Sequence, residues 1–357
     1  MTSIGSEGNP ASPATPTTTR TATTTARTTC GTPSSTNGGT AVGELQIIEY
    51  DGEWTEPPGP GIYSGVPEAI YHGSRTSLSV SGAKLLLPPS CPAKFRWSMD
   101  NPRKPKKEFD FGHIVHGIVL GVGDPVFVMD PQVYGLLKDG SLAASPTQTK
   151  AWKDAAAAAR DRGEIPVKVD DWVKADEMAA AVREDQVSGP LFEHGLAELS
   201  IYAVDPETGI LLRGRTDWIT WVDTVLNIID LKTSMTANPA ELKRKWWALS
   251  YHMQDPWYRR LLRLLGVADE IDFRFVAVDK EAPHLVTVPR YIEAARAEGE
   301  RLNRQAIDLY AECSSTDDWP GYATSTVPLD IPGWVYRDGI DSDAQALIAE
   351  LEGITES

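Results

Sequence analysis

Apolar residues at several places along the chain fall into short runs of the kind that form β-strands. Such runs occupy residues 45–48, 199–204, 273–278 and 285–288. They are rich in the β-branched and aromatic side chains that strands favour. Residues 209–234 contain two further runs on either side of Asp223-Thr224, and this pattern predicts an antiparallel hairpin.

Other stretches repeat apolar residues every three to four positions, which predicts helices. They cover residues 147–162, 170–186, 239–265, 291–313 and 342–351. The third of these is expected to break at Ser250 or Pro256, since proline interrupts a regular helix. A short helix within 78–87 would begin at Ser79 or Ser81, because serine is a favoured N-cap.

A helix that starts near Phe111 would carry a histidine on its apolar face. His116 then shares that face with Val119 and Leu120. A histidine in this setting is more often a hydrogen-bonded core residue than a metal ligand. A second observation is therefore needed before His116 counts as a ligand.

The first 43 residues differ in composition from the rest of the chain. Thr, Ser, Pro, Ala and Gly dominate them, and large apolar residues are almost absent. Such a segment cannot bury enough surface to offset the entropy lost on ordering. We predict a disordered tail over 1–43 and a single domain over 44–357, with its core at about 105–290 and a helical and irregular extension at 291–357.

Charge narrows the range of functions. The 357 residues carry 34 Lys and Arg against 50 Asp and Glu, a formal net charge of -16. This charge argues against a protein that coats nucleic acid by bulk attraction. Basic residues still cluster at 103–107, 243–245 and 259–263, where a solvated helix face is the plain interpretation.

Cysteine usage and hydropathy indicate a protein of the cytoplasm. Cys30, Cys91 and Cys313 are far apart and form no CxxC pair, so neither a disulfide framework nor a site built on four thiolates is expected. No apolar run approaches the roughly 18 residues that a membrane span needs. The N-terminus also lacks the apolar core of a signal peptide.

The predicted hairpin brings two carboxylates together. With the turn at its centre, Asp217 lies directly across from Asp230, and Arg215 lies across from Lys232. Facing Cβ atoms are about 4.5–5.5 Å apart, and like charges placed in this way repel unless something compensates them. A divalent cation is the usual compensation, and a merely solvated hairpin face is the alternative. Asp230 and Lys232 share a face because side chains alternate along a strand.

Taken in order, these residues resemble the PD-(D/E)XK nuclease superfamily. The helix with His116 precedes Asp217, Asp230-Leu231-Lys232 and Gln254-x-x-x-Tyr258, which is the pattern of the RecB-like branch. Residues 60–335 are more narrowly similar to phage exodeoxyribonucleases of the exonuclease VIII (RecE) type. The motifs are Tyr71-His72, Leu78-x-x-Ser81, Phe111-Gly112, Thr149-Lys150-x-Trp152, Arg213-Gly214-Arg215-x-Asp217, Asp230-Leu231-Lys232-Thr233-Ser234 and Trp319-Pro320-Gly321-Tyr322.

The resemblance implies an α/β fold with an αβββαβ core, in which helices flank a central mixed sheet and extra helices are added. It also implies that His116, Asp217 and Asp230 bind Mg²⁺, with Mn²⁺ as a substitute, together with the backbone carbonyl of Leu231. Carboxylate and carbonyl oxygens suit Mg²⁺, and one imidazole makes Mn²⁺ a natural replacement. Lys232 would be catalytic alongside Asp217 and Asp230.

Other residues take supporting roles by the same resemblance. Gln254 and Tyr258 would contact DNA or brace the metal site, and Arg215 and Ser81 are candidates for DNA contact or support. Glu198 begins the predicted strand 199–204 and is a candidate for a further acidic ligand. An exposed glutamate at a strand end is the plainer alternative.

The implied activity is metal-dependent hydrolysis of linear double-stranded DNA, from 5′ ends, for phage-type homologous recombination. The expected partners are DNA ends, a single-strand annealing protein and further copies of the chain in a ring, in a phage-infected or prophage-bearing bacterium and away from membranes. The alternatives are a repair or restriction-type endonuclease, a non-catalytic DNA-end-binding protein and a hydrolase of small phosphate esters. Binding alone would not need all of His116, Asp217, Asp230 and Lys232, and no Gly-rich phosphate loop supports the small-ester enzyme.

Overall fold

A computed structural model of the chain describes residues 45–57, 59–101 and 111–330. These residues belong to one compact unit. The predicted tail at 1–43, the basic residues at 103–107 and the predicted helix at 342–351 lie outside the described residues. Within them, no helix is both long enough and apolar enough to pass through a bilayer.

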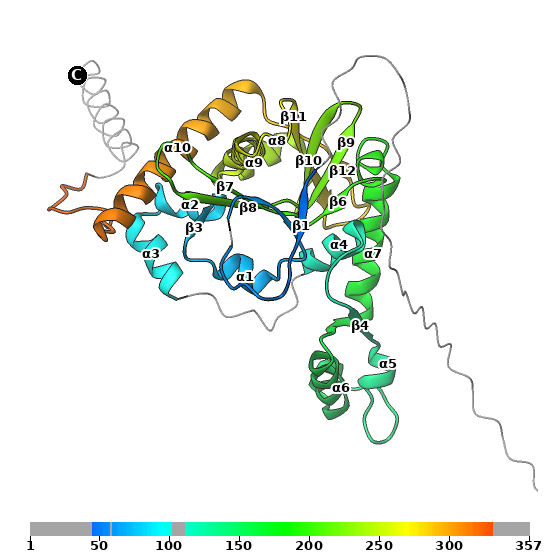
Figure 1. Cartoon of the computed structure of the whole chain (residues 1–357). Coiled ribbons are helices and arrows are strands. Elements are labelled where there is room, and N and C mark those ends of the chain that lie inside the picture. The colour runs from blue at the N-terminus through cyan, green and yellow to red at the C-terminus, as the bar shows by residue number, and fades with distance from the viewer. Residues whose placement is uncertain (1–44, 58, 102–110, 331–357) are drawn as a thin grey trace, which may run out of the picture. The chain divides into compact units, whose positions relative to one another are not determined.

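A mixed five-stranded sheet holds the predicted hairpin (Figure 1). In spatial order its strands are β12 (Val286–Thr287), β11 (Ile271–Asp279), β10 (Val225–Ser234), β9 (Trp218–Val222) and β6 (Leu196–Ala197). β10 runs parallel to β11 and antiparallel to β9. Within the hairpin Val225 faces Val222 and Ile229 faces Trp218, so the predicted turn and register are confirmed.

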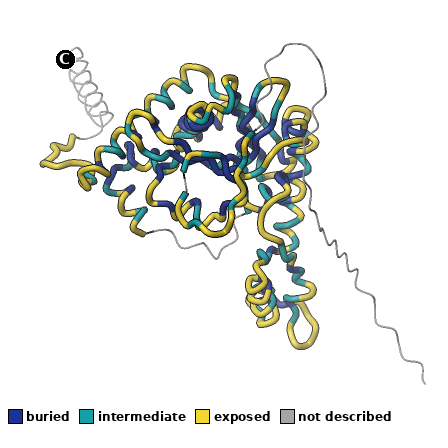
Figure 2. Tube along the Cα trace, viewed as in Figure 1, coloured by how far each residue is buried: buried dark blue, intermediate teal, exposed yellow. Residues whose placement is uncertain are grey.

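Helices cover both faces of this sheet. The helices on one face are α4 (Phe111–Leu120) and α7 (Val169–Glu184), and those on the other are α8 (Pro239–Ala248), α9 (Gln254–Leu264) and α10 (Glu293–Thr316). Successive residues of β10 point to opposite faces of the sheet. Ile228 packs with apolar residues of α8, α9 and α10, whereas Ile229 and Leu231 pack with those of α4 and α7. The buried residues gather where the helices meet the strands (Figure 2). The predicted α/β architecture, a mixed sheet flanked by helices, is confirmed.

A second five-stranded sheet contains the beginning of the first predicted hairpin arm, residues 211–215. Its strands are β1 (Ile47–Glu49), β2 (Gly61–Ser64), β7 (Ser200–Val204), β8 (Leu211–Arg215) and β3 (Ser77–Ser79), in that order. Three short helices, α1 (Glu68–Gly73), α2 (Val80–Leu86) and α3 (Pro92–Asp100), come from the same part of the chain. Arg215 pairs with Ser200 in this sheet. The predicted pairing of Arg215 with Lys232 is therefore wrong.

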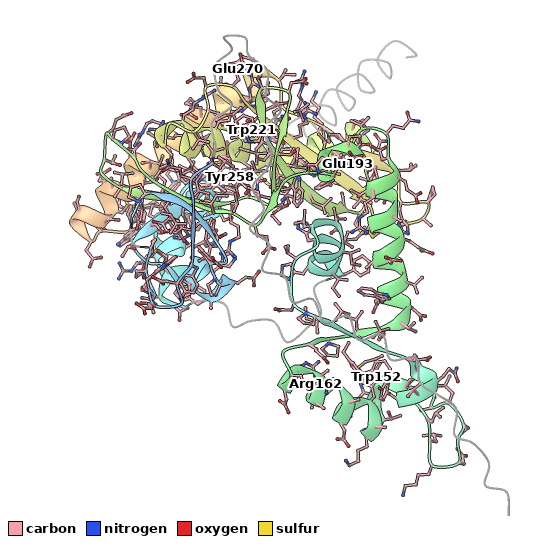
Figure 3. All side chains as sticks on the ribbon, turned by 45° about the vertical axis from the view of Figure 1, so that its right-hand side comes forward. Trp152, Arg162, Glu193, Trp221, Tyr258 and Glu270 are labelled. Carbon is pink, nitrogen blue, oxygen red and sulfur yellow. The ribbon has the colours of Figure 1, made fainter. Side chains whose placement is uncertain are left out.

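A small module stands between α4 and α7 in the sequence. It consists of β4 (Val126–Met129), α5 (Pro131–Tyr134), the 3-10 turn η1 (Pro146–Gln148), α6 (Lys150–Asp161) and β5 (Ile165–Lys168). β4 and β5 pair in parallel, and Met129, Trp152 and Ala156 form its own apolar cluster. Trp152 and Arg162 mark this module in Figure 3.

The helix predicted over 239–265 breaks where the sequence indicated. α8 ends at Ala248, Ser250 adopts a left-handed conformation with φ 53°, and the 3-10 turn η3 (Tyr251–Met253) leads into α9. Pro256 is accommodated because it lies in the first turn of α9, where its missing N–H costs no helical hydrogen bond. The short helix predicted within 78–87 is confirmed as α2, and of the two predicted caps it is Ser79 whose hydroxyl accepts from the Gly82 N–H at 3.2 Å.

Candidate functional site

The candidate site lies where two paired strands pass from one sheet to the other. β6 and β9 belong to the central sheet, whereas their continuations β7 and β8 belong to the second sheet. Backbone hydrogen bonds hold the crossing: the Thr216 N–H donates to the Leu199 carbonyl, and the Glu198 N–H donates to the Asp217 carbonyl, both at 3.0 Å. Glu198 has a positive φ of 50°. Such bulges bend strands and re-aim side chains.

Asp217 stands at this bend and joins β10 to α4. The pairing of β9 with β10 ends at Trp218–Ile229, so Asp217 lies one residue beyond the last pair and the predicted Asp217–Asp230 pair is not part of the ladder. One carboxylate oxygen, Oδ2, accepts a hydrogen bond from the Leu231 N–H at 2.8 Å and lies 3.6 Å from His116 Nδ1. His116 reaches it from the partly exposed side of α4, whose Ile114 and Val115 are buried beneath. The structure thus brings together His116, Asp217 and β10, as the resemblance implied.

Asp230 and Lys232 project from the same face of β10, as predicted. The Lys232 ammonium contacts the Asp230 carboxylate. Asp230 is almost fully buried, with 7% of its side chain exposed, whereas Lys232 retains 23%. The side-chain amide of Gln254, at the start of α9, donates to Asp230 Oδ2 at 3.3 Å. Gln254 therefore braces the carboxylate.

The charges of this pair support one another. Burial raises the pKa of Asp230, and the neighbouring Lys232 ammonium opposes that rise. Burial would lower the pKa of Lys232, but the carboxylates of Asp230 and Asp217 overcome it and hold the pKa above its ordinary value. Lys232 is consequently a positively charged group in a largely water-excluded place.

α9 fixes the backbone that leads into the bend. The Tyr258 hydroxyl, labelled in Figure 3, donates to the Arg215 carbonyl at 2.6 Å, and Trp257 Nε1 donates to the Arg213 carbonyl at 2.9 Å. Gly214 lies between Arg213 and Arg215 in the chain. A Cβ at this position would come within 2.7 Å of the Tyr258 ring. Glycine therefore permits the close approach of helix and strand. Gln254 and Tyr258 both brace the site, from one helix.

Three other predicted residues lie apart from the carboxylates. Arg215 donates to the Ser200 hydroxyl at 3.0 Å and to the Val66 carbonyl at 2.6 Å, and its guanidinium lies 4.4 Å from the Tyr71 ring centre. Ser81 is exposed on α2. Glu198 is also exposed, and only its backbone is tied to Asp217.

Two residues near Lys232 escaped the sequence analysis. Tyr251 of η3 lies beneath two ammonium groups, with its ring centre 5.5 Å from Lys232 Nζ and 4.9 Å from Lys84 Nζ. Burial and the charge of Lys232 lower the pKa of Lys84 to about 8, against an opposing effect of Asp230. For Lys84 the only signal in the sequence was a lysine within the apolar run of α2, and no motif includes Tyr251.

The donor set suits a hard divalent cation. The carboxylates of Asp217 and Asp230 and the imidazole of His116 match the ligands that Mg²⁺ or Mn²⁺ takes in proteins. In the arrangement of the described residues, however, no three His, Cys, Asp or Glu side chains are gathered closely enough to hold a metal ion. The chain itself engages both carboxylates, through the Leu231 N–H and the Lys232 ammonium. Asp217, Asp230 and His116 are therefore suitable ligands for such a cation by their chemistry, although their side chains are not gathered around one point.

The family that the sequence matches agrees with this architecture. A family model described as "PDDEXK-like domain of unknown function (DUF3799)" matches residues 79–326. The crystal structure of a protein from Eubacterium rectale, described as a "Putative exonuclease", aligns at a TM-score of 0.45 with 12% sequence identity, covering 74% of this chain and 92% of that chain. No curated protein matches the chain.

Proposed function

The chain belongs to the PDDEXK-like family, and from that premise we propose that it is a metal-dependent nuclease that hydrolyses phosphodiester bonds in DNA. The observation that carries the proposal is the approach of His116, Asp217, Asp230 and Lys232 from α4, the inter-sheet bend and β10. α4 is about a hundred residues from the bend and β10 in sequence, and the fold brings the polar groups of these elements together.

His116, Asp217, Asp230 and the Leu231 carbonyl would hold Mg²⁺, or Mn²⁺ in its place. When bound, the cation would supply Lewis-acid polarisation of the scissile phosphate and of the attacking water. Lys232 contributes a fixed positive charge, which stabilises the negative charge that grows on phosphate oxygens in the transition state. Because its surroundings exclude much of the water, that charge acts more strongly than an exposed lysine would.

The supporting contacts keep these groups in position. Gln254 orients the Asp230 carboxylate through its amide, and Tyr258 holds the backbone at Arg215, two residues before Asp217. A displacement of about 1 Å at a catalytic group can cost roughly a hundredfold in rate. The two α9 residues are therefore positioning residues.

For the substrate, we propose linear double-stranded DNA, degraded from 5′ ends in phage-type recombination. The ordered motifs that resemble exonuclease VIII support this choice over an endonuclease. The same resemblance supports assembly into a ring, a single-strand annealing partner and a location in the bacterial cytoplasm. A ring with a basic channel and an acidic outside would reconcile DNA binding with the net charge of -16.

Digestion of labelled DNA tests the proposal. A linear duplex labelled at the 5′ or the 3′ end and a closed circular plasmid are incubated with Mg²⁺ or with EDTA. We expect loss of the linear duplex only with Mg²⁺, 5′ label first, and an intact circle. Cutting of the circle would favour the endonuclease, and loss of the 3′ label first would reverse the polarity.

Variants separate the roles of the site residues. Asp217→Asn, Asp230→Asn and Lys232→Ala should each abolish cleavage with the fold preserved, whereas Lys153→Ala, at an exposed lysine of α6, serves as the control. Mn²⁺ binding measured by calorimetry should be lost in the two Asn variants and kept in Lys232→Ala. Turnover like that of the wild type in either Asn variant would contradict the metal-site assignment.

A further inference from the structure

One face of α8 carries two cations and an indole beside the candidate site. Lys243 and Arg244 precede Trp247 by four and three residues, so the three side chains share a helix face. All three are exposed, Trp247 by 59%. Within the described part of the chain neither cation forms an ion pair, whereas Lys245 pairs with Glu241 at 3.2 Å.

Trp247 is held as a flat platform. Its ring stacks on His252 at 4.6 Å between centroids and 20° between planes, and the His252 side chain is buried. Burial and the nearby Lys84 charge lower the pKa of His252, which favours its neutral ring. One face of the indole is thus supported, while its exposed surface offers the other face to a ligand.

The platform is connected to the catalytic lysine through aromatic contacts. Trp246, the neighbour of Trp247 on α8, is buried and packs on Tyr251 at 5.6 Å between ring centres. The Tyr251 ring in turn lies under Lys232 Nζ. Contacts through Trp246 and Tyr251 therefore link α8 to Lys232.

We infer that the α8 face formed by Lys243, Arg244 and Trp247 binds an unpaired stretch of the DNA strand next to the cleavage site, with a base stacked on Trp247 and phosphates at the two cations. The inference rests on the proposed nuclease function. Unpaired nucleotides expose the base faces that aromatic platforms bind, whatever the sequence. In a chain of net charge -16, a local pair of unneutralised cations marks where a polyanion can approach.

Binding of a fluorescent oligothymidylate, followed by anisotropy in EDTA, tests the inference without cleavage. Trp247→Ala should weaken binding by about tenfold or more, and Trp247→Phe should restore part of it. Lys243→Ala and Arg244→Ala should each lower the slope of log affinity against log salt by about 0.7. The matched control is Trp97→Ala on α3. Trp97 is 67% exposed, but the neighbouring cation, Arg96, is already paired with Asp100 and Asp317.

The outcomes separate this inference from the proposed function. Unchanged oligothymidylate affinity in Trp247→Ala, with the wild type cleaving DNA, would overturn the α8 assignment alone. Weakened affinity in a protein that shows no metal-dependent cleavage would support the α8 face and refute the nuclease. If Trp247→Ala changed the mass measured by light scattering and left DNA affinity intact, the face would join copies of the chain, and the inference would be wrong.

Discussion

Replacing Lys84 with methionine should stabilise the protein at neutral pH. Lys84 lies partly buried on α2, with Nζ 4.9 Å from the Tyr251 ring centre and within the field of Lys232. Burial, followed by the charge of Lys232, lowers its pKa from 10.5 to about 8. The folded state therefore disfavours the charged form, and methionine keeps most of the aliphatic stem without the charge.

The pKa shift sets the magnitude. Each unit corresponds to about 1.4 kcal/mol, so the charged Lys84 costs at most about 3 kcal/mol of unfolding free energy, and residual contact with water reduces this to about 1–2 kcal/mol. Below pH 8 the lysine is protonated in both states, and the cost is fully present. Between pH 8 and 10.5 the folded state loses the proton that the unfolded state keeps, so wild-type stability rises relative to the variant.

Urea unfolding in EDTA at pH 7 and at pH 10 measures the effect. The Lys84→Met variant should be more stable than the wild type at pH 7, and the difference should shrink at pH 10. Lys153→Met, at an exposed lysine of α6, is the control and should change stability by less than about 0.5 kcal/mol at either pH. An equal stability difference at the two pH values, or none at pH 7, would refute the explanation by burial and charge.

Two further predictions concern the scaffold around the site. Gly214→Ala should cost about 1–3 kcal/mol, since the new Cβ would meet the Tyr258 ring at 2.7 Å; thermal unfolding checks this, with Gly73→Ala as the control because its Cβ position is open. Asp205→Asn should cost about 3–5 kcal/mol, because this fully buried carboxylate neutralises two arginines of α9 and α10 at 2.5 and 3.0 Å. The exposed partner variant Asp308→Asn should cost no more than about 1 kcal/mol in the same urea titration.

The sequence was sufficient for those parts of the site that a single strand or turn determines. The hairpin register followed from the turn position, and the shared face of Asp230 and Lys232 followed from strand alternation. The break at Ser250 was predicted from local sequence as well. Each of these features depends mainly on interactions between residues that are close together in the sequence.

The passage of the strand from one sheet to the other could not be predicted in the same way. Neither Thr216 nor Asp217 is a glycine or proline that would signal a bend. A straight hairpin arm would also satisfy the alternation of apolar and polar side chains along this segment. The bend depends on α9, whose Trp257 and Tyr258 bind the carbonyls of Arg213 and Arg215 from more than forty positions away. This bend turns Arg215 toward Tyr71 and leaves Asp217 bonded to the Leu231 N–H. Tertiary contacts from α9 therefore influence which charged residues of the Arg213–Asp217 segment lie near β10.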